Sequence, residues 1–118
     1  MIGAHPHILQ GLEFYEGKPI VYSLGNFWFD NYDLQTMVAE IRISRKGISG
    51  EKEDSDAGKS GESGRQDSFT VQLIIHPGIQ SGMETRPADD GEREEIFRHL
   101  ESISPQGIKI SDKGLVTP

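Results

Sequence analysis

Two histidines separated by a single proline stand near the start of the chain, in the segment Gly3-Ala4-His5-Pro6-His7. In an extended backbone, residues i and i+2 point to the same face, so His5 and His7 can present ring nitrogens to one metal ion or to two adjacent ions. Pro6 restricts the backbone between them. The spacing therefore predicts a metal site, although an isolated H-x-H also occurs by chance in surface loops.

A metal centre needs more than these two ligands. High-affinity sites use three or four protein ligands, and hydrolytic sites with two ions gather them from several loops. The chain has no cysteine, which excludes thiolate ligands, disulfides and cysteine nucleophiles. Any metal is therefore held by histidine and oxygen ligands. Asp30 and Asp33 are weaker candidates, because Asp-Asn-Tyr-Asp is also ordinary turn chemistry.

The other histidines and one aromatic run carry weaker signals. His76 stands just before Pro77-Gly78 and is predicted to lie in a turn. His99 lies beside the apolar face of a predicted helix, where a structural role is favoured. The run Phe27-Trp28-Phe29 could stack on a sugar or a peptide, but alternating core and surface positions at a strand end explain it more simply.

The segments that must position these side chains are mostly predicted strands. Alternating residues at 12–14 and a compact apolar run at 19–23 flank the turn residues 16–18, which predicts a hairpin. The stretches 37–43 and 69–75 have the composition of strands, and we expect them to pair as a second hairpin.

Between these two strands the composition changes. Gly, Ser, Glu, Asp and Lys dominate residues 49–68, where Ala57 is the one apolar residue. Such a segment cannot bury enough apolar surface to offset the entropy of ordering. We therefore expect a flexible polar insertion at the tip of the hairpin.

The last third of the chain carries the signature of a helix. Asp89 followed by Glu92 matches a capping box, and an apolar face follows at Ile96, Phe97, Leu100 and Ile103. An extended piece at 83–87 precedes the helix, Ser104-Pro105 ends it, and residues 107–110 suit a short strand.

Length and charge limit the class of protein. With 118 residues, the chain has room for one domain, which we predict to be α+β, with mostly antiparallel strands and one C-terminal helix. The net charge of −7, from 12 basic and 19 acidic residues, argues against nucleic acid as a partner. No apolar run reaches the roughly 18 residues that cross a bilayer, so we expect this chain to be soluble.

Two stretches resemble a known family. Residues 2–13, from Ile2-Gly3-Ala4-His5-Pro6-His7 to Leu12-Glu13, and residues 17–27, which include Tyr22-Ser23-Leu24-Gly25-Asn26-Phe27, resemble the bacterial capsule and poly-γ-glutamate biosynthesis proteins of the CapA type. Those proteins are similar to metallophosphoesterases. The resemblance implies part of a four-layer αββα domain and a bacterial, extracytoplasmic location for the intact parent in the cell envelope.

The same resemblance implies roles for particular residues. His5 and His7 match the family's G-x-H-x-H element, whose histidines bind divalent metal, such as Mn, Zn, Fe or Mg, in metallophosphoesterases. Asn26 is a candidate catalytic residue whose role the resemblance does not specify. Asp, Asp and Asn-His elements that complete such sites have no counterpart here. We therefore expect a C-terminal fragment, inactive by itself, of a metal-dependent hydrolase.

This reading implies particular partners. The first is the N-terminal half of the parent domain, and any membrane association would come through other parts of the parent. Strand edges left open invite a homo-oligomer. An alternative is a non-enzymatic, β-rich accessory or interaction module in which the H-x-H turn is structural.

Overall fold

The computed structural model describes residues 1–28, 33–46 and 68–118. The flexible insertion predicted at 49–68 lies outside the described residues except for Ser68, and Phe29 and Asp30 also lie outside them.

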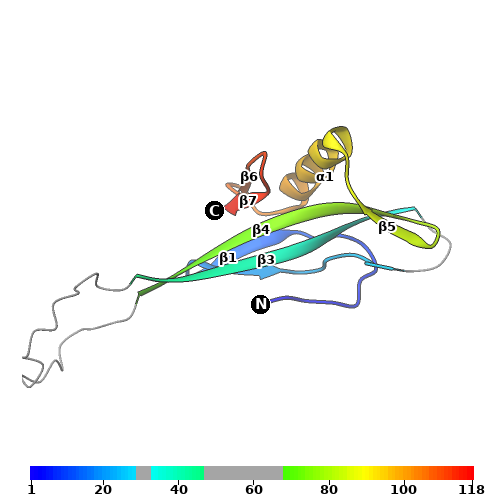
Figure 1. Ribbon diagram of the computed structural model, residues 1–118. Helices are drawn as coiled ribbons and strands as arrows, with labels where there is room; N and C mark the ends of the chain where they lie inside the picture. Colours follow the sequence, from blue (N-terminus) through cyan, green and yellow to red (C-terminus); the bar gives the residue numbers. More distant parts are fainter. Residues whose placement is uncertain (29–32, 47–67) are drawn as a thin grey trace, which may run out of the picture.

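The described residues form two antiparallel hairpins, one helix and three further short strands (Figure 1). In chain order the elements are β1 (Leu12–Tyr15), β2 (Lys18–Val21), β3 (Leu34–Lys46), β4 (Ser68–Ser81), β5 (Glu84–Pro87), α1 (Asp90–Ile103), β6 (Lys109–Ile110) and β7 (Leu115–Thr117). The predicted α+β class is confirmed. Both predicted hairpins are present, as β1 with β2 and as β3 with β4.

Strand β4 is the centre of the larger sheet. It pairs with β3 along one edge, in a register that runs unbroken from Leu34 opposite Gln80 to Lys46 opposite Ser68. Its other edge is shared by β5 and β7, and β6 completes the sheet beyond β7. The smaller sheet consists of β1 and β2 alone.

The prediction that the second long strand ends at residue 75 was wrong, as was the assignment of His76 to a turn. His76 lies within β4, opposite Val38. Pro77 does not break the strand, because its missing N–H would point away from β3. On that far side the Pro77 carbonyl accepts a hydrogen bond of 3.0 Å from the Ala88 amide. A proline is tolerated where the ladder needs no donor from it.

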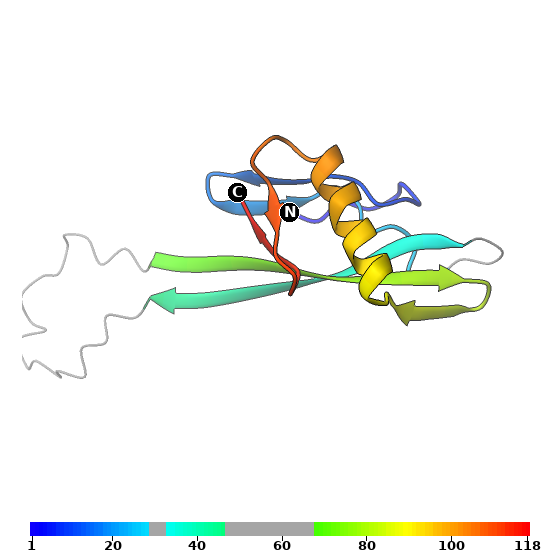
Figure 2. The ribbon, with the colours of Figure 1, turned by 90° about the horizontal axis from the view of Figure 1, so that it is seen from above.

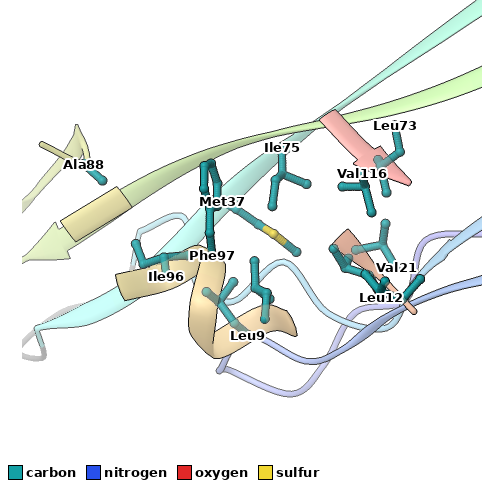
Figure 3. Close-up of a cluster of buried hydrophobic side chains, with 12 residues drawn as sticks. Leu9, Leu12, Val21, Met37, Leu73, Ile75, Ala88, Ile96, Phe97 and Val116 are labelled. Carbon is teal, nitrogen blue, oxygen red and sulfur yellow. The ribbon is translucent and has the colours of Figure 1, made fainter. Parts of the chain in front are cut away.

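The hydrophobic core lies between the small hairpin, α1 and one face of β3 and β4 (Figure 3). Its buried members are Leu9, Leu12, Val21, Met37, Leu73, Ile75, Ala88, Ile96, Phe97, Leu100, Ile108 and Val116. Leu12 is also held through its backbone, since its amide donates to the Ser104 hydroxyl at 2.8 Å. This contact joins the small hairpin to the end of α1.

The predicted capping box is confirmed, and the structure adds a third partner to it. The Asp89 carboxylate accepts from the Glu92 amide at 2.8 Å, and the Glu92 carboxylate accepts from the Asp89 amide at 2.9 Å. Arg86 of β5 donates two hydrogen bonds of 2.7 Å to the same Glu92 carboxylate. The guanidinium, together with the Asp89 amide, lowers the pKa of Glu92 to about 2. Glu92 therefore ties β5 to the start of α1.

This lowered pKa predicts a pH-dependent effect of Glu92→Gln. The ionised carboxylate stabilises the folded state above the ordinary glutamate pKa of 4.5, and this contribution is lost as the pH falls toward 2. The variant should melt at a lower temperature than the parent at pH 7, and the gap should close near pH 2. Thermal melts followed by circular dichroism measure this. Glu95→Gln, at an exposed position of the same helix, should show no such closing gap.

The register of the long hairpin predicts that a short turn can replace residues 47–67. Lys46 and Ser68 are directly paired, so an Asn-Gly turn can join them. The shortened chain should unfold cooperatively, with a free energy of unfolding no lower than that of the parent, because each halving of a loop saves about 0.6 kcal/mol of closure entropy. Urea unfolding tests this, and loss of a cooperative transition would contradict the strand pairing.

Candidate functional site

The histidine loop, residues 3–10, is attached to β2 and to the residues after it. On one side of the loop, the Gly3 amide donates to the Val21 carbonyl at 2.7 Å. On the other, the Gln10 amide donates to the Ser23 carbonyl at 3.3 Å. A Cβ at position 3 would collide with the Tyr22 carbonyl oxygen, so glycine permits the close approach of the two chains.

Ser23 fixes the middle of this loop. Its side chain is buried, with 1% of its surface exposed. The hydroxyl donates to the Pro6 carbonyl at 2.8 Å and accepts from the Gly25 amide at 3.2 Å. One buried hydroxyl thus joins the proline between the two histidines to the turn that carries Asn26. Sequence reasoning missed this role, and the polar residue inside an apolar run was the available signal.

His5 has an unusual backbone conformation. Its φ angle is 97°, in the region that favours glycine over residues with a Cβ. Residues in such conformations persist only where their surroundings hold them, and they concentrate at functional sites. Here the hydrogen bonds at Gly3 and Pro6 hold the loop on both sides of His5.

His7 and Asn26 meet at the loop. The His7 Nδ1 and the Asn26 Oδ1 are 2.7 Å apart. An amide oxygen can only accept, so Nδ1 is the donor, and in the neutral ring the lone pair is on Nε2. Metal-binding histidines are oriented in this way by a second hydrogen bond. The Asn26 Nδ2 is buried and has no hydrogen-bond partner within the described part of the chain.

The two imidazoles lie side by side at the surface. Their ring centroids are 6.2 Å apart, with the planes inclined at 47°, and both side chains are exposed. They border a depression of about 290 Å³ that Ser23 and Asn26 also line. Two rings bound to one tetrahedral Zn²⁺ at about 2.1 Å would have centroids about 5 Å apart. The observed separation is about 1 Å longer, so the two rings would have to move closer together to share one tetrahedral ion.

A third ligand is not brought to this pair. Across residues 1–28, 33–46 and 68–118, no group of three or more His, Cys, Asp or Glu side chains could hold a metal ion. Asp33 accepts a hydrogen bond from Ser81 at 2.5 Å, and Asp30 lies outside the described residues. His5 and His7 are therefore two candidate ligands, and Asn26 is placed to orient one of them.

The remaining histidines are elsewhere. His76 Nε2 is 2.7 Å from the Glu40 carboxylate, on the outer face of the sheet. That contact and a hydrogen bond from Arg42 lower the pKa of Glu40. His99 is exposed on α1 and borders a depression of about 400 Å³ beside Ile8.

The interpretation of Phe27 and Trp28 as alternating core and surface residues at a strand end was wrong. Both are exposed, at 63% and 60%, and neither lies in a strand. Their contacts hold them against the turn between β4 and β5. The Trp28 Nε1 donates to the Met83 carbonyl at 3.2 Å, and the Thr85 hydroxyl donates to the Phe27 carbonyl.

Comparison with known proteins singles out the same N-terminal stretch. The family model described as "Bacterial capsule synthesis protein PGA_cap" matches residues 1–31. The "PGA biosynthesis protein CapA" of Bacillus subtilis (strain 168) is 57% identical over 30 residues, which are 25% of this chain. Two uncharacterized proteins of Sinorhizobium fredii (strain NBRC 101917 / NGR234), y4sH and y4uA, are each 54% identical over 37 residues, which are 31% of this chain. The matches support a capsule biosynthesis protein in general terms.

These likenesses are local. The matched segment covers 8% of the length of each of these relatives. No solved structure matches the chain. Within the described residues, no helix is both long enough and apolar enough to cross a membrane.

The buried hydroxyl of Ser23 predicts a large effect of Ser23→Ala. The substitution leaves the Pro6 carbonyl and the Gly25 amide without that partner, which should lower the free energy of unfolding by about 1–3 kcal/mol. Urea unfolding at neutral pH measures the change. Ser102→Ala removes an exposed hydroxyl that bonds the His99 carbonyl within α1, and it should have a much smaller effect. Equal effects of the two substitutions would contradict the role given to Ser23.

Proposed function

We propose that this chain carries the histidine-loop portion of a capsule biosynthesis protein of the metallophosphoesterase-like type, acting in the synthesis or export of an anionic polymer such as poly-γ-glutamate. In the intact parent, His5 and His7 supply two ligands to a site for two metal ions. The rest of the domain supplies the other ligands. The parent is then an extracytoplasmic protein of the bacterial cell envelope.

The observation that carries this proposal is the hydrogen bond between His7 and Asn26. It is made by two residues 19 positions apart, both within the segment that matches the capsule synthesis family. Chance histidines in a surface loop need no orienting partner. A metal ligand does need one, because a second hydrogen bond at the ring fixes its tautomer and its orientation.

The remaining features of the loop support the same role. The strained backbone at His5 and the buried hydroxyl of Ser23 hold the two rings in a defined relation. The Asn26 Nδ2 is buried and has no hydrogen-bond partner among the described residues, which suits a site that gains a further acceptor when it is complete. A divalent metal bound there would activate water or polarise a phosphoryl or acyl oxygen. In this proposal Asn26 is a positioning residue for His7.

One observation favours a second candidate. Within the described residues His5 and His7 are joined by no third ligand, and both are exposed. This suits a non-enzymatic, β-rich accessory module in which the loop is structural. The two candidates differ in whether the histidines bind metal at all.

Metal titration of the isolated chain separates them. We expect weak binding of Zn²⁺ or Mn²⁺, because two ligands are fewer than a tight site needs. Binding should weaken as the pH falls, since protons compete with metal for the imidazole nitrogens. Asn26→Ala should weaken binding by roughly tenfold or more through the freed ring of His7. Calorimetric titration at pH 7.5 and pH 5.5 measures both effects.

The matched control replaces the other two histidines. The double variant His5→Ala with His7→Ala should abolish the binding, whereas His76→Ala with His99→Ala should leave it unchanged. The isolated chain should show no metal-dependent phosphoesterase activity. Binding that survives the loss of His5 and His7, or that the control variant removes, would show that the loop is not the metal site.

A further inference from the structure

Among the residues that the structure describes, little lies along the outer edge of β3 beyond its first few residues. β3 is the terminal strand of the larger sheet, and β4 covers only its inner edge. On the outer edge, the Met37 amide donates to the Leu24 carbonyl at 3.1 Å. Beyond that point β3 and β4 run on past the small hairpin, and no other described strand lies alongside β3 (Figure 2).

Two observations show which residues of β3 point their backbone N–H and C=O groups toward this outer edge. The Met37 amide points away from β4, toward Leu24, and the pairing of β3 with β4 contains no bulge. Backbone polar groups alternate between the two edges of a strand, so those of Ala39, Ile41 and Ile43 also point outward. The backbone of β4 shows the same alternation. The Ile75 amide, across from Ala39, points away from β3 and donates to Gly114.

The side chains along the same stretch form a self-complementary pattern. Glu40 and Arg42, which precede and follow Ile41 in the sequence, have their side chains on the outer face of the sheet. There the Arg42 Nε donates to the Glu40 carboxylate at 2.6 Å. On the other face, Ile41 and Ile43 continue the apolar side of the sheet beyond the core, with exposures of 41% and 67%. Residues 40–43 of β3 therefore carry a negative charge, a positive charge and an apolar strip.

We propose that two copies of this chain associate by antiparallel pairing of their β3 edges, with the two-fold axis at Ile41. In this register Ile41 faces Ile41 of the second copy, and Ala39 faces Ile43. The outward backbone groups of these three residues then form about six hydrogen bonds between the chains. On the outer face, Glu40 of each copy stands opposite Arg42 of the other.

Charge selects this register over its neighbours. An axis at Glu40 would place two glutamates opposite each other, and an axis at Arg42 would place two arginines there. Like charges directly opposite are destabilising in a sheet. A register shifted by one residue would place outward-pointing backbone groups of one copy opposite inward-pointing groups of the other. The hydrogen bonds between the two copies could then not form. A second copy of this chain suits this edge, because β3 itself carries both the negative and the positive side chain that the pairing brings together.

Charge reversal tests the pairing. Glu40→Arg alone and Arg42→Glu alone each create two like-charged pairs across the axis, and each should raise the dimer dissociation constant by roughly tenfold. A mixture of the two variants restores both opposite pairs and should dimerise as the parent does. Sedimentation velocity measures the species. Glu94→Arg, on the exposed face of α1, is the control and should leave association unchanged.

Cysteine cross-linking tests the position of the axis, because the chain has no native cysteine. At the axis the two Cα atoms of residue 41 would be about 5.5 Å apart, which a disulfide can bridge. The two copies of residue 43 would be roughly 13 Å apart. Ile41→Cys should therefore form a disulfide dimer under mild oxidation, and Ile43→Cys should not. The proposal would be overturned by a monomeric parent chain, by equal cross-linking at both positions, or by single charge variants that associate like the parent.

Discussion

The pairing of β3 with β4 positions both the hydrophobic core and the candidate site. It runs without a bulge from Leu34 opposite Gln80 to Lys46 opposite Ser68, and one face of it forms the floor of the core. The candidate site is attached to the same hairpin. The Leu24 carbonyl accepts from both the Met37 amide and the Thr36 hydroxyl, and Asn26 follows two residues later. The backbone that leads into Asn26 is therefore anchored to β3.

The sequence predicts local features well where a few adjacent residues determine them. The capping box needs only Asp89 and Glu92, and both of its hydrogen bonds are present. Pro77 shows where such reasoning fails. A proline followed by glycine favours a turn, but the register with β3 and the contact with Ala88 decide which edge of the strand its missing donor faces. That information is not local, so the strand was predicted to end too early.

The candidate site also has features that adjacent residues predict and features that depend on the fold. The H-x-H spacing identifies His5 and His7 from five consecutive residues. The orienting bond to Asn26 and the buried hydroxyl of Ser23 depend on how the chain returns past the loop after β2. A family resemblance placed Asn26 among the candidates, yet gave it no role. The structure adds its contact with His7, and in our proposal that hydrogen bond orients the imidazole ring.

The open edge of β3 and the histidine loop, which is attached to β2 and the residues after it, are separate parts of the structure, and this separation has a physical consequence. Leu24 occupies the outer edge at Met37, so strand pairing with another chain can extend no further toward the loop. Met37 is four residues from Ile41, or about 13 Å along a strand. In a dimer centred on Ile41, the Leu24 contacts of the two copies would then lie roughly 27 Å apart along the paired edges. Each copy keeps its own His5, His7 and Asn26, so the metal binding that we propose would not depend on association through β3.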